Sequence, residues 1–162
     1  MKNEKCIETS RDEYNTVRER LINVVRCNIP GIPRGKARAR TFYNKNMGKM
    51  QSITPKTTVN YENLVKLCYR AQQNKYFTES PLEIVITAHF EIPKSTSKKD
   101  RELIKKNQLY PTKKPDADNI AKIICDALNG VAYNDDKQIV KLTVKKDYAE
   151  IPSVDVEIRE IR

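Results

Sequence analysis

The sequence has few of the residues on which zinc enzymes and nucleophilic enzymes depend. Its 162 residues include one histidine, His89, and four cysteines that are widely spread and form no Cys-x-x-Cys pair. A zinc site needs four well-placed ligands, so we expect none here. A disulfide scaffold is also not expected in a chain this long with so few cysteines. No Ser-His-Asp or Cys-His set is evident that would support nucleophilic chemistry.

Long apolar segments are absent as well. No apolar run approaches the roughly 18 residues that a membrane span requires. The first residues, Met1 to Cys6, lack the apolar core of a signal peptide. We therefore expect a cytoplasmic protein with no membrane partner. Its length is enough for one domain with a real hydrophobic core.

Positive charge, in contrast, is plentiful. The chain has 31 lysines and arginines against 21 aspartates and glutamates, which gives a net charge of +10. Such an excess favours a polyanionic partner. Nucleic acid is the expected partner, ahead of an anionic membrane surface.

Four segments have the apolar pattern of β-strands. In the clearest of them, the even-numbered positions from Leu82 to Ile92 are apolar, and His89 faces away from them. A later segment places Gln138, Val140, Leu142 and Val144 on one face. The expected strands cover residues 21–29, 81–92, 137–147 and 154–158. Since only a turn at Pro152 separates the last two, we expect them to form a β-hairpin.

Two main helices are expected beside these strands. The first covers about residues 55–74, and the second covers about 118–128 and ends at Asn129-Gly130. Cys27 and Cys125 fall in apolar patterns and are expected in the core. The expected apolar contacts of the first helix are Val59, Leu64, Val65, Leu67 and Cys68.

The predicted fold class is therefore α+β, or mixed α/β. We expect a single small domain over residues 20–162, with a mixed β-sheet of about four strands packed with two main helices. Residues 1–19 are polar, and we interpret them as an N-terminal extension.

Two basic segments are candidates for binding a phosphate backbone. Arg34, Lys36, Arg38 and Arg40 alternate along the chain, so an extended backbone would point all four in one direction. Alternatively, the row protects an edge strand from aggregation. A lysine-rich insertion covers about residues 94–114, and part of it, near 100–107, is expected to be helical. The insertion either binds DNA or is a solvated loop.

Acidic residues gather around the helix over 118–128. Asp116 and Asp118 lie at its start, and Asp118, Lys122 and Asp126 are spaced by four residues on the side opposite the apolar stripe. Asp135 and Asp136 occupy a turn before the next strand. Clustered carboxylates repel one another, and a divalent cation removes that repulsion.

A purely structural interpretation of the same residues remains open. Asp118 would then be a helix cap. Its pairing with Lys122, and that of Lys122 with Asp126, would be ordinary surface ion pairs. Asp135 and Asp136 would only form a turn.

Taken together, the pattern Asp116-Ala-Asp118-Asn119, Lys122, Asp126-Ala-Leu128 and Asp135-Asp136-x-Gln138 closely resembles the signature of the RusA family of Holliday junction resolvases. The specific match covers about residues 114–144. At lower specificity, the order of strands, basic loop and helices resembles the family from about residue 21.

The resemblance implies a Mg²⁺-dependent, homodimeric endonuclease that resolves four-way DNA junctions by paired symmetric nicks in recombination and repair. It implies that Asp116, Asp118 and Asp136 bind the metal, for which Mn²⁺ is a substitute, and that Lys122 is the essential lysine. Asp126, which we expect to orient Lys122 or to cap a contact, and Asp135 would be supporting residues. No small-molecule cofactor is implied.

Physical chemistry is compatible with these roles. Mg²⁺ prefers oxygen ligands and keeps several waters, so three aspartates suffice on the protein side. The DNA would be held by phosphate contacts, for which the candidates are Arg34, Lys36, Arg38, Arg40, Lys113 and Lys114. Three alternatives remain: a non-catalytic basic protein that binds nucleic acid, a nuclease for other branched or single-stranded DNA, and a carboxylate-metal enzyme that acts on nucleotides.

Overall fold

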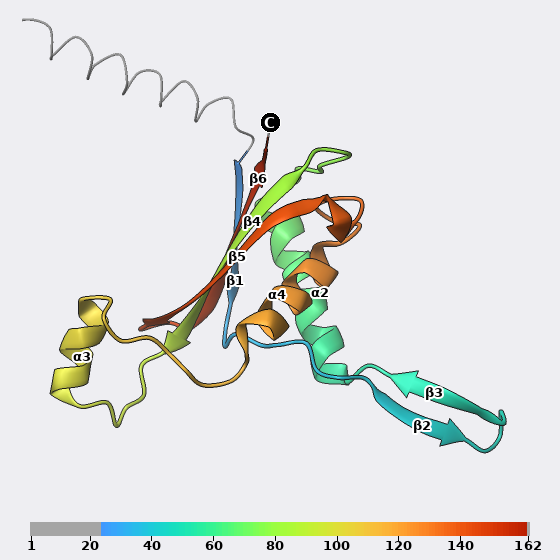
Figure 1. Ribbon diagram of the computed structural model, residues 1–162, viewed down its shortest axis with the longest axis horizontal. Helices are drawn as coiled ribbons and strands as arrows, with labels where there is room; N and C mark the ends of the chain where they lie inside the picture. Colours follow the sequence, from blue (N-terminus) through green and yellow to red (C-terminus); the bar gives the residue numbers. More distant parts are fainter. Residues whose placement is uncertain (1–23, 162) are drawn as a thin grey trace, which may run out of the picture.

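A four-stranded mixed sheet forms the centre of the protein, of which the computed structural model describes residues 24–161 (Figure 1). The strands are β1 (Val24–Pro30), β4 (Leu82–Glu91), β5 (Ile139–Ala149) and β6 (Ser153–Glu160), in the order β1-β6-β4-β5. β4 is parallel to β5, and the other pairs are antiparallel. Alternate side chains of β4 are buried, as its apolar pattern predicts.

The order of the strands contradicts the expected hairpin. β5 and β6 are consecutive along the chain, but β4 lies between them and pairs with both. Residues 150–152 therefore carry the chain across the end of β4. The prediction of a β5–β6 hairpin is wrong because pairing with the distant β4 prevails over the short turn at Pro152.

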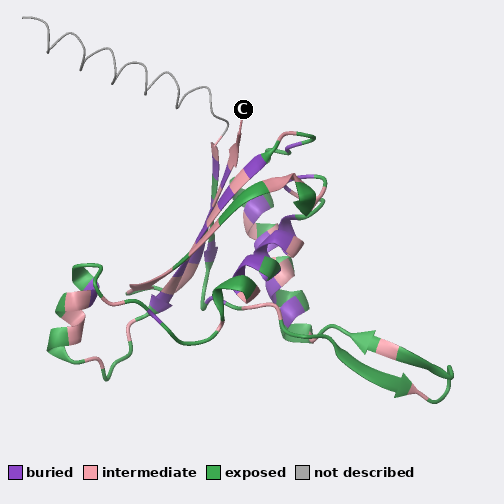
Figure 2. Cartoon of the chain, in the orientation of Figure 1, coloured by how far each residue is buried: buried purple, intermediate pink, exposed green. Residues whose placement is uncertain are grey.

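Two helices cover one face of the sheet (Figure 1). They are α2 (Lys56–Gln72) and α4 (Ala117–Leu128), close to the predicted ranges. α4 buries Ile120, Ile123 and Ile124 completely, and Figure 2 shows the buried residues where helices and sheet meet. This core and the mixed sheet confirm the predicted α+β class.

The buried side of α2 differs in part from the prediction. Val65 is buried, and Leu64 and Cys68 pack at the edge of the core. Val59 and Leu67, expected in the core, are 39% and 66% exposed. Threonine and tyrosine side chains are buried on this helix instead. The buried residues of α2 are Thr58, Tyr61, Val65 and Tyr69.

β5 also departs from the expected apolar face. Val144 packs against the core, but Val140 is 63% and Leu142 is 44% exposed. The pairing shifts at the start of β5, where Leu82 pairs with Ile139 and Glu83 with Lys141, so Val140 is an extra residue. β5 is moreover an edge strand, which leaves its side chains partly open to solvent.

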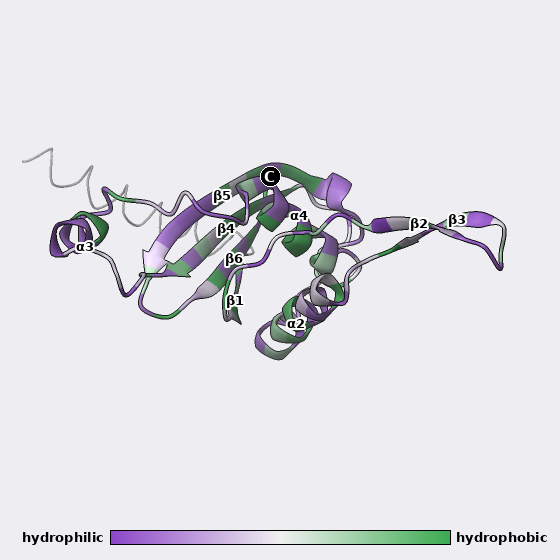
Figure 3. Cartoon of the chain, turned by 90° about the horizontal axis from the view of Figure 1, so that it is seen from below, coloured by the Kyte–Doolittle hydropathy of each residue, from purple (hydrophilic) through white to green (hydrophobic). Residues whose placement is uncertain are grey.

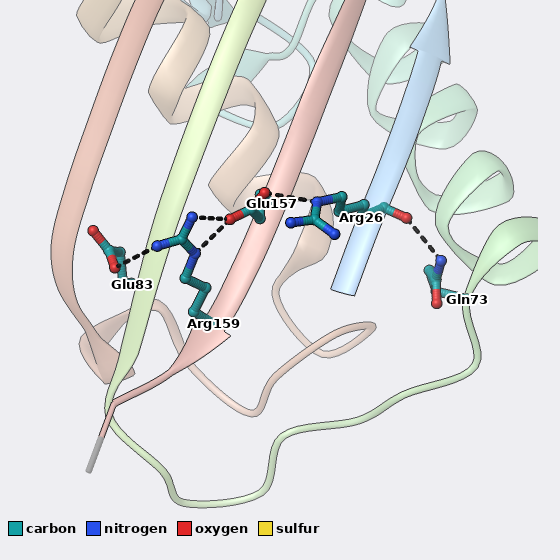
Figure 4. A network of polar contacts seen from close by, with 5 residues as sticks. All are labelled: Arg26, Gln73, Glu83, Glu157 and Arg159. Atoms are coloured by element: carbon teal, nitrogen blue, oxygen red, sulfur yellow. Dashed lines mark hydrogen bonds and ion pairs between the residues drawn. The ribbon is translucent and has the colours of Figure 1, made fainter. Parts of the chain in front are cut away.

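The face of the sheet opposite the helices carries charged side chains (Figure 4). Arg26 contacts Glu157 at 2.8 Å, and Arg159 contacts both Glu157 and, at 3.8 Å, Glu83. Burial raises the pKa of Glu157, but the two arginines outweigh it and hold the pKa below its usual value. His89 also lies on this face, 2.9 Å from Asp155, which confirms that it faces away from the core.

Two elements extend away from the body, as Figures 1 and 3 show from different sides. One is the hairpin of β2 (Arg40–Asn44) and β3 (Lys49–Ile53), and the other is α3 (Lys98–Lys105) within the lysine-rich insertion. The expected helix near residues 100–107 is thus confirmed. None of the helices within residues 24–161 is long and apolar enough to cross a membrane.

Two further expectations concern single segments. Cys27 and Cys125 are buried, as predicted. Residues 1–19, expected to form a polar extension, lie outside the described residues.

Candidate functional site

The start of α4 presents two exposed carboxylates. Asp116 occupies the cap position with an extended backbone, and its carbonyl accepts the Ile120 N–H at 3.1 Å. Its side chain makes no capping hydrogen bond. Asp118 lies in the first turn, where its carboxylate receives only a long contact of 3.5 Å from the amide of Asn119. Neither carboxylate is engaged in a hydrogen bond that caps the helix.

A pocket of about 560 Å³ lies beside this helix start. It forms where the loop after β1 meets the beginnings of α2 and α4. Its lining includes the carboxylate residue Asp116 and three predicted phosphate-binding residues, Arg34, Lys36 and Lys114. The structure therefore brings part of the basic row, part of the insertion and one of the acidic residues to one place.

Gly35 allows the basic loop to approach α4 closely. The Lys36 N–H donates a hydrogen bond of 2.8 Å to the carbonyl of Asn119. A Cβ atom at Gly35 would lie 2.8 Å from Cβ of Pro115 and 2.9 Å from Cβ of Asn119. Such distances are shorter than van der Waals contact, so only glycine fits at this position without displacement.

Lys36 fixes the loop through its side chain. Its Nζ contacts the carboxylate of Glu62 on α2 and, at 2.9 Å, that of Asp126 on α4. Burial lowers the pKa of Lys36, but the hydrogen bonds to these two carboxylates outweigh it and raise the pKa above its usual value. Lys36 therefore joins three segments, and its charge is already shared with two acids.

This contact changes the role expected for Asp126. We expected Asp126 to orient Lys122 or to cap a contact, and the structure pairs it with Lys36 rather than with Lys122. Lys122 is exposed, and the structure gives its amine no ion pair or hydrogen bond with any residue in the range 24–161. Glu62 was not among the predicted site residues, since a single glutamate on a helix gives no sequence signal.

Asp135 stabilises the turn before β5. It caps the 3₁₀ turn η1 (Asp136–Gln138) by accepting the Lys137 N–H at 3.0 Å, and Gln138 reciprocally accepts the Asp135 N–H at 3.2 Å. The hydrogen bond from the Lys137 backbone is the main reason that the pKa of Asp135 lies below its usual value. Asp135 thus has a structural role, and Asp136 beside it is exposed.

Asp136 lies in η1, which follows α4 along the chain and precedes β5, and its side chain is exposed. Burial raises the pKa of Cys125 in α4 to about 11, a hydrogen bond with Tyr133 opposes the shift, and the negative charges of Asp126 and Asp136 add to it. Asp116 and Asp118 lie at the start of α4.

The three predicted metal ligands are thus not grouped around one point. Among residues 24–161, no set of three or more histidine, cysteine, aspartate or glutamate side chains is placed to hold one metal ion. Aspartate oxygens suit Mg²⁺ chemically, but Asp116, Asp118 and Asp136 as arranged do not fit a shared ion. Their role as metal ligands stays a prediction.

The remaining basic residues divide into two groups. Arg38 and Arg40 are exposed and lead into β2, away from the pocket. Lys113 lies 5.7 Å above the ring of Phe90, at the other side of the α4 start. Residues 34–39 have no regular strand structure, so the alternating row is not one continuous face, and Lys36 is turned inward.

Comparison with known proteins identifies the family of this chain. The family model for endodeoxyribonuclease RusA matches residues 30–159. The chain is also 36% identical over 142 residues to protein YqaN of Bacillus subtilis (strain 168), which is described as uncharacterized; the match covers 86% of this chain and 99% of YqaN. The chain therefore belongs to the RusA endodeoxyribonuclease family, whose nucleases act on branched DNA and generally depend on divalent metals.

Proposed function

We propose that this protein is a structure-selective endodeoxyribonuclease that resolves four-way DNA junctions by paired, symmetric nicks. Membership of the RusA family supports the reaction class. The observation that carries the proposal is the pocket in which Asp116 lies with Arg34 and Lys114. The two cations can bind the phosphate of a phosphodiester and stabilise charge on it, and the carboxylate lies beside that position.

The residues have separate proposed roles. Arg34 and Lys114 bind a DNA phosphate, and Lys36 positions the loop that carries Arg34. Asp116, Asp118 and Asp136 are the proposed catalytic carboxylates, and Mg²⁺, or Mn²⁺ in its place, is the proposed cofactor. Lys122, whose amine is exposed, stabilises the charge that develops on the phosphate. Since the three carboxylates are not grouped, we assign no step to a metal held by all of them.

The paired nicks need two active sites. A four-way junction has approximate two-fold symmetry, so a homodimer would present equivalent sites to two opposed strands. The outward-facing Val59 and Leu67 of α2 are candidates for the apolar contact that such a dimer needs. The expected partners are thus a branched DNA and a second copy of the chain.

A non-catalytic DNA-binding protein is the second candidate function. The finding that no three such side chains are placed to hold one metal ion among residues 24–161 favours it, because the three aspartates as arranged would not share a catalytic metal. A nuclease for other branched DNA is a close variant of the leading proposal.

One assay separates these candidates. A labelled four-way junction and a linear duplex of the same sequence are incubated with the protein in Mg²⁺, in Mn²⁺ and in EDTA. Symmetric, metal-dependent nicks in the junction alone support the resolvase. Cutting of forks or flaps in preference to junctions supports the variant, and binding without any cutting in either metal supports the non-catalytic protein.

A further inference from the structure

The β2–β3 hairpin has no place in the pocket, yet it has an unusual surface. Its two strands pair with each other and with no strand of the main sheet. Most of its side chains are exposed, as Figure 2 shows along its whole length. The exposed apolar side chains between residues 40 and 53 are Phe42, Tyr43, Met47, Met50 and Ile53, with exposed fractions of 42–62%.

The pairing of the strands determines which side chains share a face. Phe42 is opposite Gln51, between the pair of Arg40 with Ile53 and the pair of Asn44 with Lys49. Directly opposite residues point to the same side of a sheet. One face of the hairpin therefore has an aromatic ring between two cationic side chains. Tyr43, opposite Met50, lies on the other face.

The charge of this segment indicates the kind of partner. From residue 34 to residue 61 the sequence has no aspartate or glutamate. Its basic residues over that range are Arg34, Lys36, Arg38, Arg40, Lys45, Lys49 and Lys56. A second copy of the hairpin would meet it with like charge. A nucleic acid offers both phosphates for the cations and base faces for the aromatic rings.

We propose that the β2–β3 hairpin is a DNA-binding arm. Phe42 or Tyr43 stacks on a base face that becomes accessible where base stacking is interrupted at the branch point of a junction, and Lys45 and Lys49 bind the adjacent phosphates. This inference rests on the proposed function, because it takes branched DNA as the substrate. It adds a contact for branch recognition outside the pocket and the Arg34–Arg40 row.

The aromatic contact is tested with the full chain carrying Phe42→Ala and Tyr43→Ala. A stacked base is worth about five- to hundredfold in affinity, so we expect junction binding to weaken by at least about tenfold. Binding to a matched linear duplex, which has no branch point, changes by less than about threefold. The control, Ile151→Ala, removes an exposed apolar side chain elsewhere and leaves both affinities unchanged.

A fluorescent base provides a direct readout of stacking. With 2-aminopurine at the branch point, binding of the wild-type protein changes the fluorescence, and binding of the Phe42→Ala, Tyr43→Ala variant at saturation does not. The same probe placed in the middle of an arm is insensitive to both proteins. Because the hairpin lies outside the core, the thermal unfolding midpoints of the proteins should agree.

The charged contact is tested with Lys45→Gln and Lys49→Gln. Each phosphate contact contributes about 0.9 to the slope of log affinity against log salt, so the slope should fall by about 1 to 2 for junction and duplex alike. The control, Lys66→Gln with Arg70→Gln, removes the same charge from α2 and leaves the slope unchanged.

Two results would contradict the proposal of a DNA-binding arm without contradicting the proposed function. One is wild-type cleavage of junctions together with variants that bind as the wild type does. The other is an equal loss of junction and duplex affinity in the aromatic variant, since stacking at a branch predicts a difference. If the wild type binds and cuts no DNA at all, both proposals fail together.

Discussion

The main sheet and the β2–β3 hairpin are built from the same kind of backbone pairing, but different forces hold them. β4 buries alternate side chains under α2 and α4, so the strand and its neighbours are held by the hydrophobic core. No residue of β2 or β3 is buried. The hairpin has little beyond its own ladder to stabilise it, and an isolated pair of strands is only marginally stable in water.

This difference separates the residues that maintain the fold from those free to bind. A change in the main sheet or in α4 affects both stability and the pocket. A change at the tip of the hairpin affects only what the hairpin touches. Gly35 and Lys36 lie between the two regions, where the chain leaves the pocket for the hairpin, and they connect the arm to the body.

The largest expected effect is on catalysis, from Asp118→Asn in the body. Loss of a catalytic carboxylate should lower the cleavage rate of a four-way junction by about 10³-fold or more. Junction affinity should be kept or increased, because a negative charge facing DNA is removed. Single-turnover cleavage and anisotropy on the same junction measure the two effects. Cleavage at the wild-type rate would remove Asp118 from the site.

The next effect is on stability, and it compares the two regions directly. Ile123→Ala in α4 removes a fully buried side chain and should lower the free energy of unfolding by about 2–5 kcal/mol. Tyr43→Ala in the hairpin should change it by less than about 0.5 kcal/mol, since the side chain is exposed. Urea denaturation of both variants measures the difference. Equal losses would mean that the hairpin belongs to the cooperative core.

The same comparison explains what the sequence could predict. The strands of the main sheet and the helices α2 and α4 each bury one side. Burial of one side makes apolar residues recur every two positions in a strand and about every 3.6 positions in a helix. The hairpin has no buried side and no such period. Only the basic row that leads into it, Arg34 to Arg40, gives a signal, and that row predicts either a phosphate-binding segment or a charged edge strand.

Pairing between segments far apart in the chain is the second feature that the sequence does not predict. The Pro152 turn favours a local hairpin, and nothing in the sequence near it indicates that β4, more than sixty residues earlier, lies between the two strands. Asp126 and Lys36 are likewise ninety residues apart. The positions of Asp116 and Asp118 at the helix start followed from Pro115 and the apolar stripe. Where Asp136 lies relative to them depends on how η1 packs, which no local pattern specifies.

A smaller loss of stability is expected where the arm joins the body, from Gly35→Ala. The added methyl group would lie within 3 Å of Pro115 and Asn119, so the loop must move away from α4. Overpacking of this kind costs about 1–3 kcal/mol. The measurement is urea denaturation, together with junction cleavage, which should fall because Arg34 is displaced. Ala39→Ser, at an exposed position of the same segment, is the control and should leave both unchanged.

The smallest effect is expected from Lys36→Met, and it depends on pH. The lost contacts with Glu62 and Asp126 should cost about 1 kcal/mol, since solvent screens a side chain that is still 24% exposed. The pKa of Lys36 is raised in the folded protein, so its stabilising contribution is complete below its ordinary pKa of 10.5 and is lost as the pH rises through the higher folded value. The difference in unfolding free energy between wild type and variant should therefore be constant from neutral pH to about pH 10 and then shrink. A difference that stays constant through about pH 12 would show that the methylene groups of Lys36, rather than its charge, hold the arm to the body.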